Sequence, residues 1–125
     1  MNISRAFLIM GSLFLLLGIA LGMHMAASGD RTLTAVHAHI NLLGFVVMAI
    51  FGLVYHAFPA MAATRLAQVH FWLHLAGSLV LLVMLFLLLS GRVTEAAMVP
   101  LAPLSELAVL LGVLIFVYNL WRNAR

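Results

Sequence analysis

Four long apolar runs, separated by short polar segments, fill almost all of this 125-residue chain. The runs cover roughly residues 6–25, 35–58, 66–90 and 103–121. Each matches the length of about 20 residues that an α-helix needs to cross the hydrocarbon core of a bilayer. The joins between them hold most of the charged residues together with glycines and prolines that end helices. The pattern therefore predicts an all-α membrane protein with four transmembrane helices in one domain, residues 1–125.

Composition excludes the soluble alternatives. Hydrophobic residues make up 66% of the chain and charged residues only 7%, which no soluble domain shows. The absence of cysteine excludes disulfides and thiolate metal sites. The net charge of +3 is too small to predict a nucleic-acid partner, so the expected surroundings are the lipid bilayer.

The arginines predict the orientation. If both termini lie on one side, that side holds four of the six arginines, namely Arg5, Arg65, Arg122 and Arg125. The opposite loops hold Arg31 and Arg92. The positive-inside rule then places both termini in the cytoplasm.

The start of the second span carries an unusual pair of polar residues, His37 and His39. Positions i and i+2 of an α-helix point about 200° apart, so these rings face opposite sides and cannot grip one ion together. Because polar groups facing hydrocarbon are costly, each ring must meet a cofactor, a partner group or another subunit. Asn41 follows on the side of His37, placed to orient its ring or to donate to a ligand. Gly44 and Gly52 allow close approach of a helix or of a flat cofactor.

A second group of histidines, His56, His70 and His74, lies toward the other end of the second and third spans. His70 and His74 are four residues apart on one helical face, a common spacing for metal ligands, and His56 lies across a short turn. This group predicts a zinc or copper site. The alternative interpretation is a set of interfacial histidines near lipid headgroups.

The residues also resemble a known family. Residues 37–59, HAHINLLGFVVMAIFGLVYHAFP, resemble the tenth helix of the catalytic subunit of haem–copper oxidases and nitric oxide reductases, in which an H-x-H pair precedes spaced glycines and a terminal Phe-Pro. Residues 69–73 with Gly77 resemble the opening of the eleventh helix, and residues 90–92 resemble the loop after it. Residues 115–121 resemble the end of the twelfth helix, so the chain is similar to the last four helices in order.

The resemblance implies roles for individual residues. In the family the two histidines of the H-x-H motif bind two different haems, which implies that His37 and His39 ligate haem iron, with Asn41 and Gly44 beside the cofactor. Arg92 falls where the family's arginine pairs with haem propionates, and a plain interfacial charge is the alternative. The family's copper site needs three histidines from helices that this chain lacks. We therefore expect no oxidase chemistry and have no reason to expect an enzyme.

The family's subunit has twelve helices in three arcs of four, and this chain resembles one arc. A homotrimer would rebuild the ring, with His37 of one subunit and His39 of the next on each haem. The expectation is a bacterial inner-membrane cytochrome with about one bis-histidine b-type haem per chain. It would serve in electron transfer, with a redox protein or a quinone as partner, or in sensing a small gas.

Two other functions stay open. One is a membrane protein that binds copper or zinc, through residues 23–25 (Met-His-Met) or through the second histidine group. The other is a non-catalytic accessory or assembly subunit of a respiratory oxidase or nitric oxide reductase.

Overall fold

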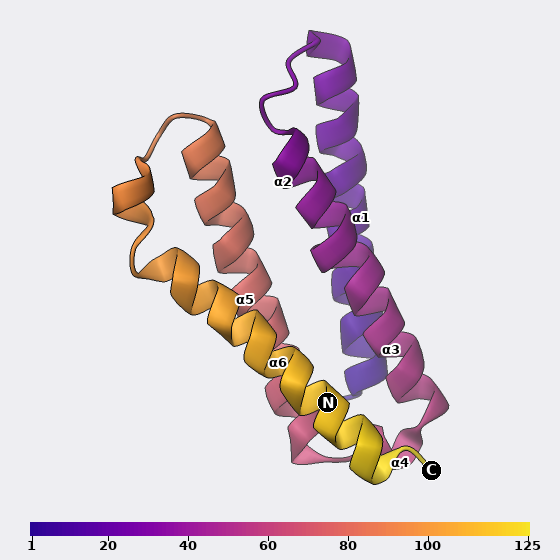
Figure 1. Cartoon of the computed structure of the whole chain (residues 1–125). Helices are drawn as coiled ribbons and strands as arrows, with labels where there is room; N and C mark the ends of the chain where they lie inside the picture. Colours follow the sequence, from indigo (N-terminus) through magenta and orange to yellow (C-terminus); the bar gives the residue numbers. More distant parts are fainter.

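The computed structural model describes all residues from 1 to 125, and it contains helices and no strands (Figure 1). Four helical segments are long and apolar enough to cross a membrane, which confirms the predicted all-α, four-span organisation. They are α1 (Ile3–Ser28), the segment Thr34–Ala57, α5 (Arg65–Leu89) and α6 (Leu101–Asn123). Single turns, α4 (Pro59–Ala62) and η2 (Glu95–Met98), lie in the joins.

The segment Thr34–Ala57, called span two below, is not one regular α-helix. It consists of α2 (Thr34–His39), a π-helical stretch η1 (Ile40–Val46) and α3 (Val47–Ala57). The sequence predicted a single helix here and gave no sign of the π-helical stretch. Such stretches are rare and are frequent at functional sites.

Polar residues extend the helices beyond the apolar runs. α1 begins three residues before the predicted run 6–25 and ends three residues after it. At its start the Asn2 side chain accepts a hydrogen bond of 3.0 Å from the Arg5 backbone N–H. At its end Gly29 adopts a φ of 71°, a left-handed conformation that glycine tolerates best. Capping, rather than hydrophobicity, therefore sets these boundaries.

The chain forms two antiparallel helix pairs (Figure 1). The first pair is α1 with span two, and the second is α5 with α6. The pairs meet at the end of the molecule that carries both termini and diverge toward the other end. We call these the terminal end and the divergent end.

Glycines bring α1 and span two into close contact. A Cβ atom added at Gly44 would lie 2.5 Å from Cγ of Phe14, and one added at Gly52 would lie 2.8 Å from Cγ of Leu8. Ser4 Oγ also donates a hydrogen bond of 2.8 Å to the Gly52 carbonyl. The sequence left open whether a helix or a flat cofactor approaches these glycines. Within the chain it is α1 that does so.

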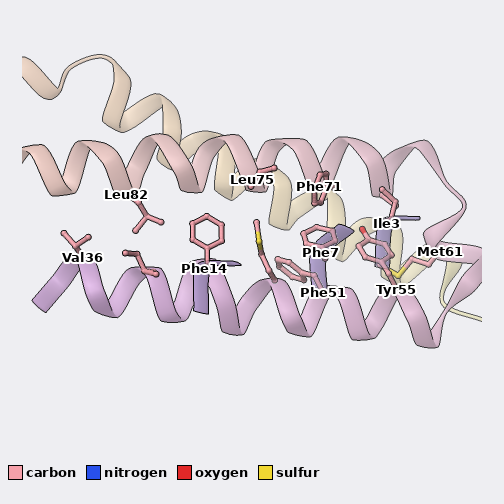
Figure 2. Packing of buried hydrophobic residues seen from close by; sticks show 13 residues of the cluster. Ile3, Phe7, Phe14, Val36, Phe51, Tyr55, Met61, Phe71, Leu75 and Leu82 are labelled. Carbon is pink, nitrogen blue, oxygen red and sulfur yellow. The ribbon is translucent and has the colours of Figure 1, made fainter. Parts of the chain in front are cut away.

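The buried side chains lie in a row between the two helix pairs (Figure 2). Aromatic rings fill the part of the row nearest the terminal end, where Phe7 packs edge-on against Phe71 at 5.0 Å and stacks on Tyr55 at 5.7 Å. Aliphatic side chains such as Val36 and Leu82 fill the opposite part. The ring packing thus holds the two pairs together at the terminal end.

α6 is fixed to the turn between span two and α5. Asn119 is fully buried, and its Nδ2 donates to the Met61 carbonyl at 3.2 Å and to Thr64 Oγ1 at 3.0 Å. Along the α5–α6 contact, a Cβ atom at Gly77 would meet the Ser105 carbonyl oxygen at 2.9 Å. Small residues and one buried amide therefore determine how α6 packs.

The packing at Gly44 predicts a loss of stability for Gly44→Ala. The added methyl would press on the Cβ, Cγ and Cδ1 atoms of Phe14, near the rigid root of that side chain. We expect the free energy of unfolding in detergent to fall by about 1–3 kcal/mol. Gly112→Ala is the matched control, because its methyl would meet neighbours only at 3.4 Å or beyond. Equal effects of the two substitutions would contradict the packing described for Gly44.

Candidate functional site

His37 lies in α2 and is half-buried against α1. A Cβ atom at Gly22 would lie 2.9 Å from Cε1 of the His37 ring, so this ring faces α1. Asn41 Nδ2 donates to the His37 carbonyl at 3.0 Å and lies 3.4 and 3.3 Å from Nδ1 and Nε2. Asn41 Nδ2 is the only protein group that bonds to the ring nitrogens of His37, through these two long contacts.

His39 has a different environment. Its side chain is exposed, and Nδ1 donates a hydrogen bond of 2.8 Å to the Ala35 carbonyl, one turn earlier. A carbonyl can only accept, so the proton is on Nδ1 and the lone pair is on Nε2. Nε2 has no protein partner. Histidines that bind metals commonly have this arrangement, in which a backbone carbonyl fixes the tautomer and the ring orientation.

The two rings point in opposite directions from α2, because this part of span two is a regular α-helix. His37 faces α1 and His39 faces away from the protein. No three His, Cys, Asp or Glu side chains of this chain lie close enough together to hold a metal ion. A single chain thus offers two separate imidazole donors.

The other predicted site residues lie apart from these rings. Gly44 is buried against Phe14, so the face it occupies is filled by α1. Arg92 is exposed in the loop after α5, with its guanidinium carbon 5.4 Å from the centre of the Phe86 ring. Figure 1 places this loop and α2 at the divergent end of the molecule. Arg92 is therefore at the same end as the histidine pair, without a contact to it.

The second histidine group is divided by the fold. His56 is exposed on α3, whereas His70 and His74 are fully buried on α5, with ring centroids 6.0 Å apart. The structure therefore brings His70 and His74 near each other and leaves His56 outside. His70 and His74 lie in the protein interior, so the alternative interpretation of histidines near lipid headgroups does not apply to them.

Each buried histidine forms one hydrogen bond to span two. The Tyr55 hydroxyl and His70 Nδ1 are 3.0 Å apart. His74 Nε2 donates to the Leu43 carbonyl at 3.1 Å. These are the only side-chain hydrogen bonds between span two and α5. They join the two helix pairs inside the membrane-spanning region.

Aromatic rings surround His70 closely. The ring of Phe51 lies 4.4 Å from it nearly edge-on, and the rings of Phe7 and Phe116 lie at 5.0 and 5.3 Å. His70 Nε2, His74 Nδ1 and Ser78 Oγ have no hydrogen-bond partner. These three polar residues follow at intervals of four along one side of α5. In a helix this apolar, such a stripe predicts an interior face, and this signal could have placed His70 and His74 in the core.

Comparisons with protein-family models, curated proteins and solved structures gave no match. The chemistry of the site follows from its side chains. His39 offers an exposed imidazole nitrogen with its tautomer fixed, and His37 offers a ring whose nitrogens contact only Asn41 Nδ2, at 3.3 and 3.4 Å. Imidazole in this state binds haem iron, copper and zinc.

The bond between Tyr55 and His70 predicts a measurable contribution to stability. Tyr55→Phe removes the hydroxyl and keeps the ring, so we expect the free energy of unfolding to fall by about 1 kcal/mol. Tyr118→Phe is the matched control, because Tyr118 is exposed and its hydroxyl has no hydrogen bond. Unfolding in mixed detergent micelles measures both, and a loss no larger than that of the control would count against this role.

Proposed function

We propose that this chain is a membrane b-type cytochrome that holds haem between subunits through His37 and His39. The free Nε2 of His39 carries the proposal, since Nδ1 of the same ring is already bound to the Ala35 carbonyl. Within one chain this oriented nitrogen has no partner. Ligation of a metal centre outside the chain gives it one.

The opposite directions of the two rings support binding between chains. One chain presents His39 outward, whereas its His37 faces its own α1, so the two rings of one chain cannot ligate the same iron and the second ligand has to come from another chain. Ligation by His37 would cost the fold only the long contacts of its ring nitrogens with Asn41 Nδ2, at 3.3 and 3.4 Å. Repeating this contact around a closed ring gives every subunit the same two partners.

Three copies are the number that the family resemblance favours, because three four-helix chains make twelve helices. Such a homotrimer has three interfaces and about one haem per chain. The resemblance to haem–copper oxidases also favours a bacterial inner membrane, and we place both termini in the cytoplasm. The four arginines on the side of the termini support that orientation.

Electron transfer is the function that this ligation favours. If His37 and His39 both held the iron of a haem, the group would supply one-electron redox chemistry rather than gas binding. Arg92 lies at the divergent end with α2, where its guanidinium suits the carboxylates of a haem. The electron partner would be a redox protein or a membrane quinone.

A copper or zinc ion is the second candidate, because the free Nε2 of His39 suits either metal. This candidate needs no haem and no trimer. A purified sample that retains copper or zinc and has no Soret band would favour it over the cytochrome.

Alanine substitutions test the two ligands separately. His37→Ala and His39→Ala should each abolish the bands of low-spin b haem in the reduced spectrum, because each removes one axial ligand at every interface. His56→Ala is the matched control, since His56 is exposed and has no hydrogen bond. We expect it to keep the full haem content in a pyridine haemochrome assay. Normal spectra for either of the first two variants would exclude ligation by that histidine.

The mass of the assembly tests the proposed symmetry. The protein part of the purified complex should have about three times the 13.6 kDa mass of the chain, by native mass spectrometry from detergent. Histidine ligation across interfaces predicts that His39→Ala lowers the trimer fraction as well as the haem content. A monomer that carries a full complement of haem would contradict binding between subunits.

A further inference from the structure

We infer that His74 is a positioning residue whose hydrogen bond to the Leu43 carbonyl fixes the π-helical stretch η1, and with it the directions of His37 and His39. The inference rests on the proposed function only for what those two rings bind. The bond and the stretch are features of the chain itself.

The stretch η1 lies between the histidine pair and the rest of span two. His39 is the last residue of α2, and Ile40 is the first residue of η1. The backbone N–H of Val47 bonds to the Leu42 carbonyl, five residues earlier, as in a π-helix. Exchanging one π turn for an α turn rotates everything before it by about 100°, the angle of one residue. The state of η1 therefore decides where His37 and His39 point relative to α3.

π-helical stretches are rare, and this one receives a hydrogen bond from outside span two. The bond from His74 is the only hydrogen bond by which a side chain of another helix reaches the backbone of η1. It forms in the membrane-spanning region, where water does not compete for the carbonyl. His74 thus acts on η1 from α5.

The ring of His74 is itself held in place. It is fully buried, and the Phe51 ring lies 5.2 Å from it at an angle of 88°. The centre of the Phe7 ring lies 6.4 Å from the centre of the His74 ring. Because its partner is a carbonyl, Nε2 carries the proton and donates. His74 also connects the two histidine groups, since it bonds to a residue only one turn beyond His39.

The neighbouring bond supplies a control within the same helix contact. Tyr55 bonds to His70 from α3, which lies beyond η1. Both bonds join span two to α5 inside the membrane-spanning region, and only the one from His74 reaches η1. Loss of the Tyr55 hydroxyl should therefore weaken the helix contact and leave η1 unchanged.

Two nitroxide labels on either side of η1 test the inference. The chain has no cysteine, so Ala38→Cys with Leu53→Cys gives a labelled pair without background in the full-length protein. Pulsed electron paramagnetic resonance then measures the distance between the labels in four backgrounds: the parent sequence, His74→Leu, His74→Gln and Tyr55→Phe. A second pair on α5, Val69→Cys with Val83→Cys, reports whether α5 itself is intact.

In the parent sequence, with labelled chains diluted by an excess of unlabelled ones so that only pairs within one chain are measured, we expect one distance. His74→Leu should shift it by about 2 Å or more or split it into two populations, because η1 loses its support and relaxes toward an α-helix. Gln retains an N–H donor near the place of Nε2, so His74→Gln should restore the parent distance. Tyr55→Phe should leave the distance unchanged.

Two results would overturn the inference: an unchanged distance in His74→Leu, or a shift of the same size in Tyr55→Phe. Should His74→Leu fail to fold, His74→Phe keeps an aromatic ring against Phe51 and must give the same shift.

The haem provides an independent readout that separates this inference from the proposed function. If the parent protein binds haem, His74→Leu should change the low-spin resonance signal or the midpoint potential, and His74→Gln should restore it. If the parent protein binds none, the proposed function fails, while the label distances still decide the role of His74.

Discussion

Two hydrogen bonds from buried histidines determine how the two halves of this molecule meet. In hydrocarbon, apolar side chains gain little from each other that lipid does not already give, so helix association depends on close packing and on polar contacts. Tyr55 with His70, and His74 with the Leu43 carbonyl, provide those contacts between span two and α5. The aromatic rings of Phe7 and Phe51 pack around them. These two hydrogen bonds and the packed rings together join the two helix pairs.

This use of polar groups separates the histidines into two classes. His70 and His74 serve the packing of the helices, since each has one ring nitrogen hydrogen-bonded to span two. His39 keeps one nitrogen without a protein partner, and the nitrogens of His37 contact only Asn41; both residues lie in α2 at the divergent end, away from the aromatic core. A bound cofactor would therefore use the second class without disturbing the first. His74 nevertheless links the classes, because the stretch it supports begins directly after His39.

The sequence was sufficient for properties that depend on local chain geometry, namely the four spans and the opposite directions of His37 and His39. The sequence was insufficient for contacts between segments that are far apart along the chain. Gly44 is compatible with a cofactor or a helix in sequence, and only the position of α1 shows that Phe14 covers it. The pairing of His74 with Leu43 depends on how two helix pairs meet. The π-helical stretch has no signal in its composition, which is that of an ordinary apolar helix.

Haem content of the purified, unmodified protein tests the proposed function most directly. A pyridine haemochrome assay combined with a reduced-minus-oxidised spectrum measures both the amount and the ligation state. We expect the sharp α and β bands of a low-spin b-type haem at about one haem per chain. A featureless spectrum, after expression with added haem, would contradict the proposal and leave His39 as a ligand for another metal.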